Sequence, residues 1–211
     1  MKKNILFVFA HFDDESFSAG TIKKLVDKGH SVNVLIICGN GKEFDDNRKN
    51  IFHTNITLLG CEGSYLKYFD LTLGDLKEDV KIEIKDALSL IIMSENISEV
   101  YTNCLNDLHS DHRVVSEMVR VVCRPNTKKV ITKLYECYIP GSLEFGILWD
   151  DFKTIVDISD YANLKSQCIL NYSNYLKSMD YHKISMLNSQ YNGALYGFDY
   201  AERFKLIWEK Q

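Results

Sequence analysis

Short apolar runs and stretches with helical spacing alternate along the first part of the chain. The runs Asn4–Phe9 and Ser31–Cys38 are continuous and rich in β-branched or aromatic residues, which is typical of strands buried on both faces. Between them, from Ser16 to Lys28, small and apolar residues recur at helical intervals, and Gly29 suits a helix end. Strand, helix and strand in this order predict a right-handed βαβ unit with parallel strands.

The alternation continues through most of the remaining sequence. We predict further helices over 47–59, 78–93, 112–122 and 160–176, and further strands over 66–71, 100–102, 129–138 and 153–158. The tail, residues 181–208, holds much of the aromatic content, which fits a packed outer layer better than the wall of a sugar pocket. No repeat, low-complexity tract or linker divides the sequence, so we predict one α/β domain over residues 1–211.

Composition narrows the classes of function. With 45% apolar and 26% charged residues, the chain has the make-up of an ordinary soluble protein. The net charge of -4 and the lack of a long basic run argue against nucleic acid or a membrane surface as the main partner. No apolar run approaches the ~20 residues of a transmembrane helix. The six cysteines form no Cys-x-x-Cys pair, which favours free thiols and a cytoplasmic location. A homo-oligomer is compatible with all of these features.

Two polar clusters stand out against this background. The turn Ala10–Glu15, with the sequence AHFDDE, directly follows the first predicted strand, and His109–His112, with the sequence HSDH, follows the strand predicted over 100–102. Ligands of open α/β sheets bind at the edge formed by the carboxyl ends of the strands. We therefore expect the two clusters to converge there.

The residue types in the clusters fit a metal-dependent hydrolase. A catalytic zinc ion takes three protein ligands from histidine nitrogens and carboxylate oxygens, and His11, Asp14 and His112 provide such a set. Hydrolysis also needs a carboxylate next to the attacking water but not on the metal, and Asp13 is placed to act as this general base. His109 is the candidate for stabilising the oxyanion, with Asp111 expected to orient its imidazole and to raise its pKa.

The two clusters resemble the A-H-P-D-D-E and H-x-D-H motifs of the PIG-L/LmbE-like family of zinc-dependent N-deacetylases. Further similarities extend over nearly the whole chain: Gly39–Gly41, Arg48 ahead of Leu59 and Gly60, the segment Val156–Ser159, and Tyr200–Phe204. The resemblance implies an α/β fold with a Rossmann-like, mostly parallel sheet flanked by helices and a C-terminal α+β extension.

The same resemblance implies roles for particular residues and a class of substrate. Zinc would be held by His11, Asp14 and His112, with Asp13 as general base, His109 as oxyanion stabiliser and Asp111 as its partner. Arg48 would contact the substrate. Members of the family remove the acetyl group from N-acetylglucosamine-type sugars in glycoconjugates, nucleotide sugars and related metabolites, so a small amino-sugar substrate is implied.

One position departs from the family pattern. Phe12 occupies the place where the family usually has proline, and it gives up the fixed φ of a proline turn. We expect the chemistry to survive, because no catalytic group is lost. We also expect the phenylalanine ring to lie beside the metal ligands and to alter the shape of the pocket.

Three simpler or different interpretations remain open at this stage. Taken alone, each cluster is explained better by a polar turn whose carboxylates cap a helix than by a metal site. Metal-dependent phosphoesterases also use His/Asp clusters, although many need two metals and more ligands than this sequence offers. A carbohydrate-binding relative without catalysis is the third alternative. The presence of both Asp13 and His109 argues against it.

Overall fold

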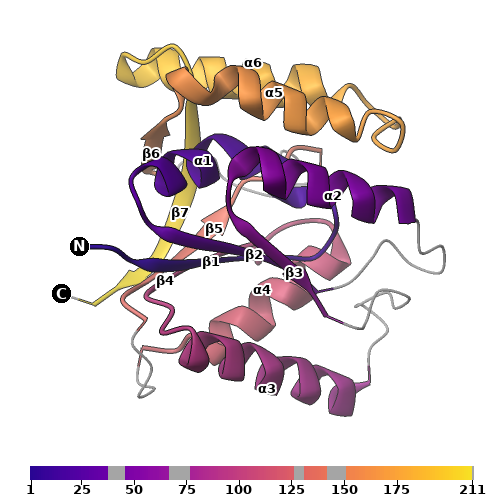
Figure 1. Cartoon of the computed structure of the whole chain (residues 1–211), viewed down its shortest axis with the longest axis vertical. Coiled ribbons are helices and arrows are strands. Elements are labelled where there is room, and N and C mark those ends of the chain that lie inside the picture. The colour runs from indigo at the N-terminus through magenta and orange to yellow at the C-terminus, as the bar shows by residue number, and fades with distance from the viewer. Residues whose placement is uncertain (38–45, 67–76, 126–130, 142–150, 211) are drawn as a thin grey trace.

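The computed structural model describes residues 1–37, 46–66, 77–125, 131–141 and 151–210. Its centre is a seven-stranded sheet in the order β3-β2-β1-β4-β5-β7-β6 (Figure 1). Every pair formed among the first five strands is parallel. They are β1 (Asn4–Phe9), β2 (Ser31–Ile36), β3 (Glu62–Tyr65), β4 (Glu99–Thr102) and β5 (Lys133–Cys137). The predicted α/β class with a mostly parallel sheet is confirmed.

Helices cover both faces of the sheet. Figure 1 shows α1 and α2 on one face and α3 and α4 on the other. The central strand β1 is buried on both sides, because Phe7 and Phe9 pack into the core under the first pair while Leu6 and Val8 pack into the core under the second. The helices are α1 (Ala19–Asp27), α2 (Asp46–Leu59), α3 (Glu78–Ser94) and α4 (Ser110–Val122). None of the helices in the described ranges has the length and apolar character needed to cross a bilayer.

The C-terminal extension joins the main sheet and adds an outer helical layer. Strand β7 (Ala201–Glu209) runs antiparallel to both of its neighbours, β5 and β6 (Thr154–Asp157). Helices α5 (Ala162–Asn171) and α6 (Tyr181–Tyr196) lie outside α1 and α2 (Figure 1). Two short 3-10 turns, η1 (Asp14–Ser18) and η4 (Ser159–Tyr161), precede α1 and α5.

The structure adds one strand and shortens one predicted helix. Strand β3 was not predicted, whereas residues 67–71 of the strand expected over 66–71 lie outside the described ranges, as do Gly39–Gly41. Strand β3 has no apolar run because it is a partly exposed edge strand, and Gly63 leaves room for Phe52 and Ile56 of α2. The helix expected over 160–176 ends at Asn171 and is preceded by η4.

A buried glutamate of β7, Glu202, binds both the start of α1 and a lysine of α5. The Glu202 carboxylate accepts hydrogen bonds from the backbone N–H groups of Gly20 (3.1 Å) and Thr21 (2.9 Å), at the start of α1. It also pairs with Lys165 Nζ of α5 at 2.8 Å, and only 4% and 3% of the two side chains are exposed. One carboxylate therefore connects the last strand, the first helix and the outer helical layer.

We predict that Glu202→Gln lowers the free energy of unfolding by about 3 kcal/mol, because it leaves the Lys165 ammonium buried without its counter-charge. Glu209→Gln is the matched control on the same strand, since Glu209 pairs with Lys133 at a half-exposed site. Its cost should stay below about 1 kcal/mol. Urea denaturation of the two variants and the parent measures both values, and equal costs would contradict the prediction.

Candidate functional site

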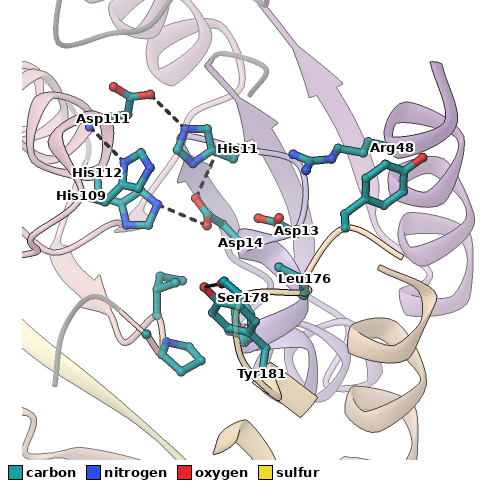
Figure 2. A pocket seen from close by; sticks show the side chains of 15 residues that line it. His11, Asp13, Asp14, Arg48, His109, Asp111, His112, Leu176, Ser178 and Tyr181 are labelled. Carbon is teal, nitrogen blue, oxygen red and sulfur yellow. Dashed lines mark hydrogen bonds and ion pairs between the residues drawn. The ribbon is translucent and has the colours of Figure 1, made fainter. Parts of the chain in front are cut away.

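A pocket of about 550 Å³ opens at the carboxyl ends of the strands. All seven residues proposed from the sequence line it, so the structure brings the two clusters together as expected. Figure 2 shows the three histidine rings and Asp14 on one side, with Asp13 and Arg48 on the other. The seven are His11, Asp13, Asp14, Arg48, His109, Asp111 and His112.

Asn103 joins the two strand ends that carry the clusters. Its Oδ1 accepts a hydrogen bond from the Ala10 N–H at 2.9 Å, and its Nδ2 donates to Asp14 Oδ2 at 3.1 Å. The His11 backbone N–H also donates to this Asp14 oxygen, at 3.2 Å. Asn103 is fully buried and follows β4, which pairs in parallel with β1. The sequence reasoning missed its role, because an asparagine after a strand ordinarily indicates only a loop.

His112 lies between two buried carboxylates. Its Nδ1 is 2.8 Å from Asp107 Oδ2, and its Nε2 is 3.4 Å from Asp14 Oδ1. Burial alone would lower the pKa of His112, but the charge of Asp14 and the hydrogen bond that His112 donates to Asp107 raise it to about 10. Burial would likewise raise the pKa of Asp14, but the adjacent His112 holds it well below its usual value. The two neighbouring carboxylates therefore favour the positively charged form of the His112 imidazole.

Asp107 is a second residue that the sequence reasoning missed. Its side chain is 1% exposed, and its Oδ1 also accepts the His109 backbone N–H at 2.8 Å. It thus fixes both the loop and the ring of His112. Its position five residues before a clustered histidine is the available signal, since metal-binding histidines commonly donate their second ring nitrogen to a carboxylate.

The Asp111 carboxylate contacts His11, with Oδ2 at 3.0 Å from His11 Nε2. Its contact with His109 is through the backbone instead, because the Asp111 N–H donates to His109 Nδ1 at 3.3 Å. Burial and the neighbouring His11 and His112 lower the pKa of His109, and Asp111 opposes this shift without reversing it. Asp111 thus raises the pKa of His109 as expected, but the net shift is downward. The His109 ring is stacked on His112, with centroids 4.6 Å apart.

Asp13 has an unusual backbone conformation. Its φ is 121°, a region in which non-glycine residues are strained. The side chain is 8% exposed and lines the pocket. Burial, followed by the charge of Asp14, raises the pKa of Asp13 well above its usual value, and the Arg48 guanidinium acts in the opposite direction. The residue proposed as general base is thus held in place at a conformational cost.

Arg48 reaches the pocket from α2. Its guanidinium carbon lies 4.7 Å from the centroid of the Tyr175 ring, a cation–π distance. Its Nη1 is buried and makes no hydrogen bond with any described part of the chain. A cationic donor facing the pocket with unused hydrogen-bonding capacity is suited to a polar group of a bound molecule.

Phe12 points away from the pocket. Its side chain is 2% exposed and packs in the core, with ring centroids 5.2 Å from Phe52 and 6.0 Å from Tyr65. It is absent from the described lining of the pocket. The expectation that its ring would lie beside the metal ligands is therefore wrong, because the turn directs residue 12 into the core and residues 11, 13 and 14 into the pocket.

The wall opposite the histidines comes from segments far along the chain. Tyr175, Leu176 and Ser178 follow α5, Tyr181 begins α6, and Ile139–Gly141 follow β5. Figure 2 shows Leu176, Ser178 and Tyr181 on this wall. Tyr181 Oη lies 3.1 Å from Ser178 Oγ. The outer-layer interpretation of the aromatic tail is wrong for Tyr181, because the chain returns across the sheet edge in a way that local spacing does not reveal.

The donor atoms fit a metal ion such as zinc. Two ligands at tetrahedral zinc, with bonds of about 2.0–2.2 Å, lie about 3.3–3.6 Å apart. The 3.4 Å between His112 Nε2 and Asp14 Oδ1 matches this separation. Ring nitrogens of His11, His109 and His112 also lie within 4.8 Å of one another, so a three-histidine set competes with the set that includes Asp14.

Comparison with known proteins identifies the family. Residues 6–123, more than half of the chain, match the PIG-L family, described as GlcNAc-PI de-N-acetylase. This chain belongs to the PIG-L family. The match contains both polar clusters and the pocket residue Arg48.

Individual relatives agree with this assignment. The chain is 34% identical over 143 residues to a probable N-acetyl-alpha-D-glucosaminyl L-malate deacetylase 2 of Bacillus cereus, over 59% of this chain and 63% of that protein. An N,N'-diacetylchitobiose deacetylase of Pyrococcus horikoshii has the same fold, with a TM-score of 0.76 and 20% identity over 97% of this chain and 84% of that one.

The fold also occurs with a different activity. The 4-carboxy-2-hydroxymuconate hydratase GalB of Pseudomonas putida aligns with a TM-score of 0.77 and 16% identity, over 99% of this PIG-L family chain and 98% of that one. Fold similarity at this level does not determine the reaction. The side chains of the site, and not the fold alone, decide the reaction.

We predict that Asp13→Gly is more stable than Asp13→Ala by about 1 kcal/mol. Both changes remove the same buried carboxylate, but only glycine relieves the strain of positive φ, and this gain outweighs its greater loss of backbone entropy. Thermal or urea unfolding of the pair measures the difference. Equal stability, or a more stable alanine variant, would show that residue 13 is not strained.

Proposed function

We propose that this protein is a zinc-dependent N-deacetylase that hydrolyses the N-acetyl group of an amino sugar or of an amino-sugar conjugate. The observation that carries the proposal is the convergence of the two motif-bearing strand ends in one pocket, where His and Asp donor atoms have a spacing suited to zinc and Asp13 lies beside them. Membership of a family described as de-N-acetylases supports the same reaction.

We assign His11, Asp14 and His112 as the metal ligands. The Nε2 atom of His11 is occupied by Asp111, which leaves Nδ1 for the metal, whereas His112 uses Nε2 because Nδ1 is bonded to Asp107. Each ligating ring is then oriented by a carboxylate, as is usual for metal-bound histidine. Zinc, when bound, would lower the pKa of water and polarise the acetyl carbonyl.

The other side chains in the pocket account for proton transfer and charge. Asp13 accepts the proton of the attacking water and delivers it to the amine as the amide C–N bond breaks, which gives acetate and a free amine. His109 stabilises the oxyanion. Its Nδ1 accepts the Asp111 N–H, so the ring proton resides on Nε2, and a neutral imidazole donates from there.

The pocket supports a small sugar-containing substrate. Arg48, which lies over the Tyr175 ring, offers an unpaired donor to a hydroxyl or acidic group, and the ring of Tyr181 lines the pocket where a sugar can pack against it. The deacetylases named above act on N-acetylglucosamine-type compounds. We propose the same class here, without choosing the group attached to the sugar.

A phosphoesterase is less well supported. In the described part of the chain, the side chains with a spacing suited to a metal ion all lie in this one pocket, and a two-metal site would need further ligands. Retention of Asp13 in a strained conformation also argues against a binding module without turnover, because binding sugar would not require that strain.

The activity is tested by acetate release. The zinc-loaded protein should release acetate from at least one member of a panel of N-acetylglucosamine, its disaccharide, a malate conjugate and a nucleotide sugar. Chelation should abolish this release and added Zn²⁺ should restore it. Asp13→Ala should bind zinc like the parent and lower kcat by about 10²- to 10⁴-fold. Release of phosphate without acetate, or full activity of Asp13→Ala, would overturn the proposal.

The ligand set is tested by a matched pair of variants. Loss of a residue that only orients a metal ligand weakens metal binding about 10- to 100-fold, so loss of a ligand should cost at least about 100-fold. We expect Asp14→Ala to weaken zinc binding by this amount or more, and His109→Ala to change it less than about 10-fold. Competition with a chromogenic chelator measures both affinities. The opposite result would favour the three-histidine set.

A further inference from the structure

The strained residue Asp13 is clamped on both sides by hydrogen bonds. Its backbone N–H donates to Glu15 Oε2 at 3.0 Å. Its carbonyl oxygen accepts from the Ser16 N–H at 3.0 Å and from Ser16 Oγ at 2.6 Å. Strained backbone persists only where the surrounding structure enforces it. The clamp from Ser16 is local to the turn, whereas Glu15 connects the turn to the rest of the protein.

Glu15 is fully buried and uses its second oxygen for two distant groups. Its Oε1 accepts a hydrogen bond from Asn55 Nδ2 of α2 at 3.1 Å and from the hydroxyl of Tyr172 at 2.9 Å. Tyr172 directly follows α5. The Glu15 carboxylate therefore links the backbone of Asp13 to α2 and to the end of α5.

The two helices are also connected to each other. Asn55 Nδ2 donates to the Cys168 carbonyl at 3.1 Å, and Asn55 Oδ1 accepts from Asn171 Nδ2 at 2.8 Å. Toward the pocket, Arg48 of α2 lies over the ring of Tyr175, which follows α5. Helix α2 and the segment that follows α5 thus hydrogen-bond to Glu15. The same two segments place Arg48 and Tyr175 in the wall of the pocket.

We propose that Glu15 is a positioning residue: it holds Asp13 in the conformation from which it transfers protons, and it ties that conformation to the Arg48–Tyr175 wall. This inference rests on the proposed function, in which Asp13 is the general base. Glu15 itself is buried behind the turn and is absent from the described lining of the pocket, so it acts through Asp13.

The chemistry of the three partners explains why a carboxylate is needed. The backbone N–H of Asp13 and the side-chain amide of Asn55 are both donors, and they contact different oxygens of Glu15. A glutamine has only one acceptor oxygen, and its NH₂ group would face a donor in either orientation. Glu15→Gln therefore keeps the shape of the side chain while it removes one of the two links.

Glu15→Gln should lower kcat for acetate release by about 10- to 100-fold, because small misplacement of a catalytic group has effects of this size. KM and zinc affinity should each change less than about 3-fold. On an Asp13→Ala background, Glu15→Gln should cause no further loss of turnover, as expected for residues that act through one another.

Two control variants separate positioning from general destabilisation. Glu202→Gln alters another buried, multiply hydrogen-bonded glutamate that does not contact Asp13, so kcat should stay within about 3-fold of the parent at a temperature where both proteins are folded. Tyr172→Phe removes one donor from Oε1 and keeps the Oε2 link to Asp13, so its loss of kcat should be several-fold smaller than that of Glu15→Gln.

A crystal structure of Glu15→Gln gives a readout that does not depend on activity. We expect residue 13 to leave positive φ in this variant. An unchanged Asp13, or a kcat within 3-fold of the parent, would overturn the positioning role, and so would a loss of zinc as large as that of Asp14→Ala. Failure of the parent protein to release acetate from any substrate would instead refute the proposed function, and the structure of the variant would still test the link between Glu15 and Asp13.

Discussion

The parallel pairing of β1 with β4, fastened at its end by Asn103, is the constraint on which the site depends. Val8 lies opposite Thr102 in this pairing, so the segments that follow the two strands leave the sheet at the same edge. Asn103 then bonds to Ala10 and to Asp14, one on each side of the first histidine. Two clusters about a hundred residues apart in sequence become one set of donor atoms because two central strands share a direction.

Around this junction, the protein buries two glutamates, and each accepts several hydrogen bonds. Glu15 is held by Asn55 and Tyr172, while Glu136 of β5 accepts from Arg120 and from the Leu105 N–H on the loop before the second cluster. A buried carboxylate without partners is strongly destabilising, whereas a fully bonded one fixes the geometry around it. These glutamates lie behind the two segments that line the pocket and bind their backbone N–H groups.

The division of labour within the turn after β1 follows from its backbone. Successive side chains point in different directions. His11 and Asp14 face the second cluster, Phe12 fills the core against Phe52, and Asp13 projects into the pocket at positive φ. The phenylalanine that departs from the family pattern therefore contributes to packing. Within four residues, the turn contributes one side chain to the core and three to the pocket, and the strained backbone of Asp13 is the cost.

The sequence by itself determined the alternation of strands and helices, the central parallel strands and the identity of the seven pocket residues. It did so because burial on both faces leaves continuous apolar runs, and because the chemistry of the clusters is local. Only the tertiary structure decided which carboxylate orients which histidine, where Phe12 points, that Tyr181 lines the pocket and that Asn103 joins the two strand ends. Edge strand β3 and the insertion of β7 between β5 and β6 were also decided there. These features depend on contacts between residues far apart in sequence, which no local pattern records.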